Sequence, residues 1–269
     1  MSESESAPPS AAPGWHGPRF AFGTLTALPI RVTRWDRAAA RSGMLWAPVA
    51  GLTVGLCAAA LGGLLLLLGA GPLLAAVATV AVPAVLTRGL HLDGLADTAD
   101  GLGSGRPAAE ALRIMRQSDI GPFGVVTLVL VLLAQVAALA GLYADSWARG
   151  AVAAALCGVT ARLALTLAAR TGVPPARPEG LGAAVAGTVP VRAALLVAAG
   201  AVGLAAGAGA AGGPYGAVRC AAAVLVGCAA AELLLRHCVR RLGGITGDVF
   251  GGIAETAATV SLVMLTLGG

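Results

Sequence analysis

The chain has 269 residues, of which 57% are hydrophobic and only 12% are charged, and its mean hydropathy is +0.84. This composition excludes an ordinary soluble domain, in which about 25% of residues are charged. All 18 basic residues are arginines scattered between apolar stretches, so the net charge of +5 does not indicate a nucleic-acid partner. We therefore predict an all-α, polytopic integral membrane protein.

The N-terminal 18 residues, MSESESAPPSAAPGWHGP, are rich in serine, proline and alanine. They lack the basic start and apolar core of a signal peptide, so we predict a disordered cytoplasmic tail at 1–18. The rest, 19–269, is predicted to be a single transmembrane domain. Its first stretch, FAFGTLTALPI at 20–30, is too short to cross a bilayer and indicates an interfacial or re-entrant segment.

Seven later segments are long and apolar enough to span, which requires about 20 residues. They lie at 44–69, 72–88, 122–143, 150–169, 193–212, 217–236 and 251–268. Loops rich in arginine are retained in the cytoplasm. With a cytoplasmic N-terminus, 15 of the 18 arginines fall in cytoplasmic connections. The sequence thus predicts a bundle of about seven transmembrane helices whose N-terminus is cytoplasmic.

The second connection concentrates acidic residues in RGLHLDGLADTADGLGSG at 88–105. Asp93, Asp97 and Asp100 have i, i+4 and i+7 spacing, so in a helix they share one face and repel one another. Mg²⁺ would compensate that charge, because it takes carboxylate oxygens and leaves positions for substrate phosphates. His91 precedes them and is either a general base, a group that orients an aspartate, or a packing residue.

A second cluster lies near the C-terminus, in RRLGGITGDVFGGIAE at 240–255. Asp248 and Glu255 are seven residues apart and are predicted to complete the metal site. Gly247 belongs to a glycine-rich stretch whose N–H groups suit phosphate oxygens. Arg240 and Arg241 are candidate phosphate ligands.

Two further segments of the cytoplasmic connections are candidates for substrate binding. Arg113 and Arg116 lie one helical turn apart, and they either bind phosphate or flank the membrane. The loop PPARPEGLG at 174–182, which contains Arg177, is too rich in proline for a helix and is expected to order over a large polar ligand. The predicted site therefore comprises the connections 88–121, 170–192 and 237–251.

The chain resembles the cobalamin synthase (CobS) family of adenosylcobinamide-GDP ribazoletransferases. The resemblance covers residues 20–268 and is carried by GLHLDGLADTADG at 89–101, IMRQSDIGPFG at 114–124, ARPEGLG at 176–182 and GGITGDVFGGIAE at 243–255. The chain departs from the family pattern at Gln117 and Asp119. These stand where the family often has an acid and a base, so both positions are doubtful as functional residues.

The resemblance implies transfer of the adenosylcobinamide-phosphate group from adenosylcobinamide-GDP to the 5′-hydroxyl of α-ribazole, or to α-ribazole 5′-phosphate, with release of GMP, late in cobalamin biosynthesis. It implies an enzyme of the bacterial plasma membrane whose active site faces the cytoplasm. The expected partners are these substrates and the lipid bilayer. Self-association and association with other cobalamin-assembly enzymes are further expectations.

Two other functions are consistent with carboxylates in a membrane protein. A CDP-alcohol phosphotransferase also carries aspartates at helical spacing, but its DGxxAR element is absent, because Asp93-Gly94 is followed by Leu-Ala-Asp. A divalent cation transporter would use acids within its spans. Here the acids gather in the cytoplasmic connections instead, which favours an enzyme.

Overall fold

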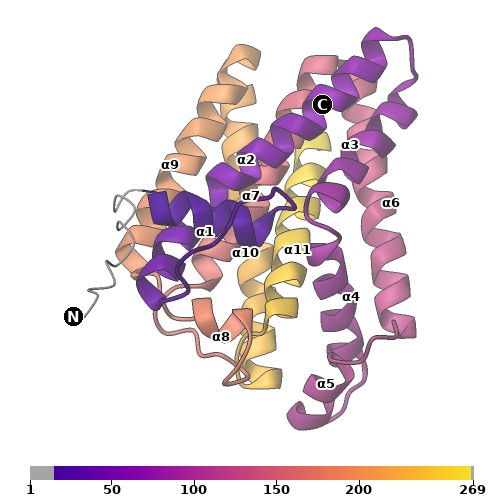
Figure 1. Ribbon diagram of the computed structural model, residues 1–269. Coiled ribbons are helices and arrows are strands. Elements are labelled where there is room, and N and C mark those ends of the chain that lie inside the picture. Colours follow the sequence, from indigo (N-terminus) through magenta and orange to yellow (C-terminus); the bar gives the residue numbers. More distant parts are fainter. Residues whose placement is uncertain (1–14, 268–269) are drawn as a thin grey trace, which may run out of the picture.

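The computed structural model describes residues 15–267, a range that contains helices and no β-strand (Figure 1). The elements are α1 (His16–Leu25), α2 (Arg37–Leu67), α3 (Pro72–Leu86), α4 (Leu90–Gly103), α5 (Ala108–Ile114), α6 (Pro122–Asp145), α7 (Trp147–Ala168), α8 (Leu181–Val185), α9 (Val191–Gly209), η2 (Ala210–Gly212), α10 (Gly213–Leu242) and α11 (Gly247–Thr266). The all-α prediction is confirmed.

In the described part of the chain, five helical segments are long and apolar enough to cross a membrane, and the pair α3–α4 would be a sixth if it forms one broken span. The five segments are Arg37–Leu67, Pro122–Asp145, Trp147–Ala168, Val191–Leu242 and Gly247–Thr266. The prediction of a multi-pass membrane protein is confirmed. The count is below seven for two reasons: the stretch 191–242, which contains two of the predicted spans, passes as one segment, and Pro72–Leu86 passes only together with α4. The number seven and the cytoplasmic N-terminus stay predictions.

The stretch 191–242 folds as two helices that pack against each other. A single helix of 52 residues would be roughly 78 Å long, far more than a bilayer core of about 30 Å. The break comes at Gly213, whose φ of 75° is unfavourable for residues with a side chain. Gly209 and Gly216 then bring the backbones of α9 and α10 into contact.

The acidic segment forms a helix of its own, α4, and not an irregular loop. α3 ends at Leu86 and the chain turns by 88° before α4 begins. The turn uses left-handed backbone at Arg88 (φ 53°) and Gly89 (φ 71°). This bend directs the acids away from the axis of α3 and along the side of α11.

α11 lies inside the bundle and is packed against α4, α6, α7 and α10 (Figure 1). Glycines allow its close approach to α4. A Cβ atom on Gly94 would lie 2.6 Å from the carbonyl oxygen of Asp248, and one on Gly251 would lie 2.9 Å from that of His91. Two segments about 150 residues apart in the sequence therefore meet at backbone contact.

The first helix begins before the predicted interfacial stretch, within the last residues of the predicted tail. Residues 1–14 of the predicted tail lie outside the described residues, and α1 starts at His16. α1 packs against α2 with Phe20 buried beside Gly43. Asp36 starts α2, because its carboxylate accepts the N–H groups of Ala38 and Ala39.

Candidate active site

The structure brings together two carboxylates of the first predicted acidic cluster and one of the second. Asp93 and Asp97 lie on α4, and Asp248 lies in the first turn of α11. Burial raises the pKa of Asp97 to about 7, and the charges of Asp93 and Asp248 add to this rise. We call Asp93, Asp97 and Asp248 the acid group.

Arg177 supplies positive charge beside the acid group. Its Nη1 lies 3.6 Å from Asp248 Oδ2, and its Nη2 donates to the carbonyl oxygen of Leu112. Burial lowers the pKa of Arg177, while Asp248 and Asp97 favour its charged form. Arg116 is an electrostatic neighbour of Asp248 and Arg177. These two arginines, both predicted to bind substrate, lie near the acid group.

The loop that carries Arg177 is held against the start of α11. The Ala176 N–H donates to the Ile245 carbonyl at 2.9 Å, and the Ile245 N–H donates to the Pro174 carbonyl at 2.9 Å. Thr246 starts α11, since its hydroxyl accepts the Val249 N–H and also lies 3.2 Å from Asp248 Oδ2. The predicted phosphate-binding residue Gly247 is exposed at this helix start.

Asp100, predicted as a metal ligand, fixes the start of α6. Its Oδ2 accepts the Gly121 N–H at 2.8 Å and its Oδ1 accepts the Gly124 N–H at 2.9 Å. The side chain is buried, and both oxygens satisfy amides at a helix N-terminus, where carboxylates are favoured.

Glu255 lies apart from the acid group, deeper in the bundle. Its Oε2 accepts from Gln135 Nε2 at 2.9 Å, and Gln135 Nε2 also lies 2.9 Å from the Thr259 hydroxyl. Glu255 lines a small interior cavity together with Gln135 and Arg162. The predicted pairing of Asp248 and Glu255 in one metal site is therefore not seen.

His91 is buried on the side of α4 that faces the bundle. Its Nδ1 lies 3.4 Å from Arg162 Nη2, and because a guanidinium only donates, Nδ1 is the acceptor. Nε2 therefore carries the ring proton, and no hydrogen-bond partner for it lies among the described residues. Burial, helped by the charge of Arg162, holds the pKa of His91 well below its usual value. These features suit a hydrogen-bond donor better than the predicted general base.

The other predicted arginines point to different places. Arg113 is exposed on α5. Arg240 lines a surface cavity with Arg170 and Arg236, and Arg241 donates to the carbonyl oxygen of Arg106 at 3.3 Å. Neither Arg240 nor Arg241 lines the cavities around the acid group.

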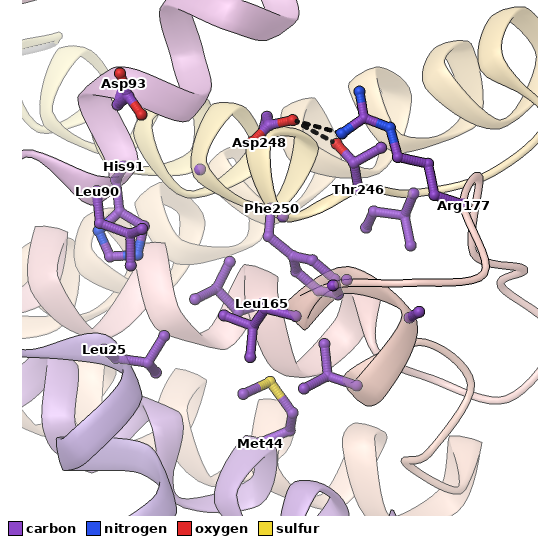
Figure 2. A pocket seen from close by; sticks show the side chains of 18 of the residues that line it. Leu25, Met44, Leu90, His91, Asp93, Leu165, Arg177, Thr246, Asp248 and Phe250 are labelled. Atoms are coloured by element: carbon purple, nitrogen blue, oxygen red, sulfur yellow. Dashed lines mark hydrogen bonds and ion pairs between the residues drawn. The ribbon is translucent and has the colours of Figure 1, made fainter. Parts of the chain in front are cut away.

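Two cavities meet at the acid group and share Leu90 and Asp93. The first, of about 280 Å³, is called the apolar cavity and is lined by Asp93, Asp248, Arg177, His91 and by Leu25, Met44, Leu165, Val185, Ile245 and Phe250. Figure 2 shows Asp93, Asp248 and Arg177 along one side of it and Leu25, Leu165 and Met44 on the other. The second, of about 720 Å³, is called the polar groove and includes Asp97, Thr24, Thr26, Arg88, Gln117, Ser118 and Asp119.

The donor set around the acid group does not enclose a metal ion by itself. Within residues 15–267, no three histidine, cysteine, aspartate or glutamate side chains come close enough together to hold one. Asp93 and Asp248 nevertheless face an accessible cavity, and their charge is only partly offset by Arg177. Mg²⁺ commonly uses one or two carboxylates and completes its shell with water and phosphate oxygens. The residues therefore fit an ion that is shared with a phosphorylated substrate.

Comparison with known proteins places the segments that form this site within one family. Residues 17–266 match the family described as CobS, cobalamin-5-phosphate synthase. The chain belongs to the CobS family. The matched range contains the four motif segments 89–101, 114–124, 176–182 and 243–255, which include the acid group and the Arg177 loop, and it contains α11.

Alignments with curated relatives cover nearly the whole chain. The adenosylcobinamide-GDP ribazoletransferase of Frankia casuarinae is 44% identical over 262 residues, covering 93% of this chain and 94% of the relative. The ribazoletransferase of a Nocardioides species is 40% identical, covering 91% and 96%. That of Brevibacillus brevis is 30% identical, covering 91% and 95%. No solved structure matches the chain.

Three polar residues of this CobS-family site were missed from the sequence. Arg162 and Gln135 are isolated in apolar helices, and a polar residue within a span is a signal for function. Thr246 precedes Gly247-Asp248, and its position indicates a helix cap. Those signals were available, but nothing in the sequence shows that Arg162 meets His91.

Proposed function

We propose that the chain transfers the adenosylcobinamide-phosphate group from adenosylcobinamide-GDP to α-ribazole or its 5′-phosphate. Membership of the CobS family and the names of its relatives support this reaction. The structural observation that carries it is the acid group beside Arg177, placed where two cavities meet. One cavity for each substrate is what a transfer between two molecules requires.

The reaction is a substitution at phosphorus. A ribose hydroxyl oxygen of the acceptor attacks the phosphorus next to the cobinamide, and the bond between that phosphorus and the bridging diphosphate oxygen breaks. GMP leaves with the bridging oxygen and its electron pair, and the hydroxyl proton passes to a base. Because an acceptor phosphorylated at its 5′ position also reacts in this scheme, we assign the attack to another ribose hydroxyl and not to the 5′-hydroxyl expected from the resemblance.

The acid group supplies that base. A general base works best when its pKa lies near the working pH. Asp97 has a pKa of about 7 and lines the polar groove one helical turn from Asp93. We assign proton acceptance to Asp97, and charge neutralisation on the diphosphate to Arg177 and Arg116.

Asp93 and Asp248 are proposed to hold Mg²⁺ together with diphosphate oxygens. The ion would supply stabilisation of the charge that develops on the phosphate oxygens. Asp100 and Glu255 are then positioning residues. Asp100 acts by fixing the start of α6, and Glu255 acts through its hydrogen bond with Gln135. The acid group is proposed to face the cytoplasm, because the arginine-rich connections of the sequence are expected on that side.

The assay for this function uses membranes that contain the full chain, incubated with adenosylcobinamide-GDP, α-ribazole and Mg²⁺. We expect GMP and a cobalamin product in equal amounts. Membranes that yield neither product, in a preparation where the chain is present and folded, would rule the proposal out. Ion flux in liposomes without transfer would support the cation transporter.

The pH dependence of transfer follows from the Asp97 assignment. Only the ionised carboxylate accepts a proton, so kcat/KM should fall about tenfold per unit as pH drops below about 7, and level off above it. A nearby cation lowers a carboxylate pKa, so more Mg²⁺ should move the midpoint to lower pH. Rate profiles between pH 5.5 and 8.5 at two Mg²⁺ concentrations measure both effects. If the pH midpoint of kcat/KM does not change with the Mg²⁺ concentration, the ion is not bound beside Asp97.

A further inference from the structure

We propose that the apolar cavity binds the aromatic base of the acceptor nucleoside, and that its ribose lies at the acid group. This inference rests on the proposed function, and it adds which substrate occupies which cavity. Three features of the cavity support this assignment: its size, the chemistry of its walls and the direction in which its polarity changes.

The size of the apolar cavity suits a nucleoside. Its volume of about 280 Å³ lies close to the lower end of ligand pockets, which hold roughly 300–1,000 Å³. A corrinoid macrocycle that carries a nucleoside diphosphate is several times larger than a nucleoside. The polar groove, with about 720 Å³ and a wider opening to solvent, is the site with room for part of that substrate.

The inner wall of the cavity is almost wholly apolar. Leu25, Met44 and Leu165 are each less than 5% exposed, and Val185, Ile245 and Phe250 are also buried. Such a wall stabilises an apolar aromatic ring through burial of its surface. A guanine base presents several donors and acceptors around its edge, which would lose their partners there. The wall therefore selects against the GDP moiety of the other substrate.

Two buried donors on residues that line the cavity lack a partner within residues 15–267: the Nε of Arg177 on its polar side and the Nε2 of His91 beside the apolar wall. His91 is 3% exposed, and its Nε2 has no partner within residues 15–267, while Nδ1 is taken by Arg162. A benzimidazole nucleoside such as α-ribazole has one unsubstituted ring nitrogen, which is an acceptor. The donor beside the apolar wall matches this acceptor, so we assign the Nε2–H of His91 to this nitrogen.

The polarity of the cavity also orients the nucleoside. Figure 2 places Asp93, Asp248 and Arg177 on one side, with Leu25 and Met44 opposite and His91 between them. A base on the apolar side directs the ribose hydroxyls toward the carboxylates. That is the position from which a hydroxyl can lose its proton and attack a diphosphate in the neighbouring groove.

The test measures binding of each substrate separately, without turnover. The full chain in detergent micelles is dialysed against α-ribazole, or against adenosylcobinamide-GDP with Mg²⁺. Met44→Trp fills the cavity, and the matched control Leu56→Trp puts the same side chain on the exposed surface of the same helix, α2. Leu165→Phe is a smaller second change, in case Met44→Trp does not fold.

We expect the cavity variants to weaken α-ribazole binding by at least about tenfold, because overfilling a packed site is costly. Binding of adenosylcobinamide-GDP, which also reports on folding, should stay within about twofold of the wild type. Free 5,6-dimethylbenzimidazole should compete with α-ribazole for the wild type, and guanosine should not.

Two results would overturn the assignment: unchanged α-ribazole binding in a folded cavity variant, or a selective loss of adenosylcobinamide-GDP binding. Failure of the proposed function is a separate outcome. In that case the wild type would form no GMP and no cobalamin, although it binds α-ribazole and the cavity variants do not.

Discussion

Asp97→Asn should reduce the transfer rate by about 10²–10⁴-fold, the range in which a general base contributes, and should leave the protein at least as stable as the wild type. The carboxylate of Asp97 is partly buried among Asp93, Asp248 and Asp100, and its ionisation is therefore opposed in the folded protein. An uncharged amide of the same shape removes this repulsion. Activity and stability should thus change in opposite directions, as is expected of a functional residue that is costly to the fold.

The sign of the stability change depends on pH. Because the folded-state pKa of Asp97 is raised to about 7 from 3.8, the ionised residue destabilises the fold increasingly as pH rises from about 4 to 7. The Asn variant should therefore gain most at pH 8 and nothing near pH 3.5. Thermal unfolding in detergent at both pH values, with initial rates at pH 8, measures the two effects.

Asp145→Asn is the matched control for Asp97→Asn. Asp145 is exposed at the far end of α6, where it pairs with Arg149 at 2.7 Å. Exposed ion pairs contribute about 0–1 kcal/mol, so both rate and unfolding temperature should stay near the wild type. Wild-type activity in Asp97→Asn would remove Asp97 from the mechanism.

Gly94→Ala should reduce activity strongly and destabilise the fold by about 1–3 kcal/mol, the usual cost of overpacking. The added Cβ would lie 2.6 Å from the carbonyl oxygen of Asp248 and 3.0 Å from its Cα, so α4 and α11 must move apart. That movement separates Asp93 and Asp97 from Asp248. The measurements are the unfolding free energy and the Mg²⁺ dependence of the rate, which should need more Mg²⁺.

Gly141→Ala gives the comparison for Gly94→Ala. Gly141 lies within α6, and a Cβ there has nothing within 4 Å. Alanine is favoured over glycine in helices by up to about 1 kcal/mol, so this variant should be neutral or slightly stabilised. If Gly94→Ala behaves in the same way, the close approach of α4 and α11 is not needed for the site.

The sequence predicted the helical class and every membrane-like segment, because these depend on local apolar composition. It also predicted that the acids from both ends of the chain belong to one site, and the structure brings Asp93 and Asp97 beside Asp248. The individual roles depend on tertiary contacts. Asp97 and Asp100 were expected on one helical face, but only Asp100 accepts the N–H groups of Gly121 and Gly124.

Asp248 and Glu255 do not meet in one site for a geometrical reason. Asp248 and Glu255 share a helical face, but they are about 10 Å apart along α11 at 1.5 Å per residue. Asp248 thus stays at the helix start, while Glu255 lies among Gln135 and Arg162 in the interior. Likewise, the sequence does not show that Arg240 and Arg241 lie outside the cavities around the acid group.

The shared border between the apolar cavity and the polar groove has a kinetic consequence. Because the apolar cavity and the polar groove have only Leu90 and Asp93 in common among their lining residues, one molecule can occupy each at the same time. A ternary complex then forms before any bond breaks, and no phosphorylated form of the protein itself has to accumulate. Double-reciprocal plots at several fixed concentrations of the second reactant would accordingly intersect and would not run parallel, and either reactant could arrive first.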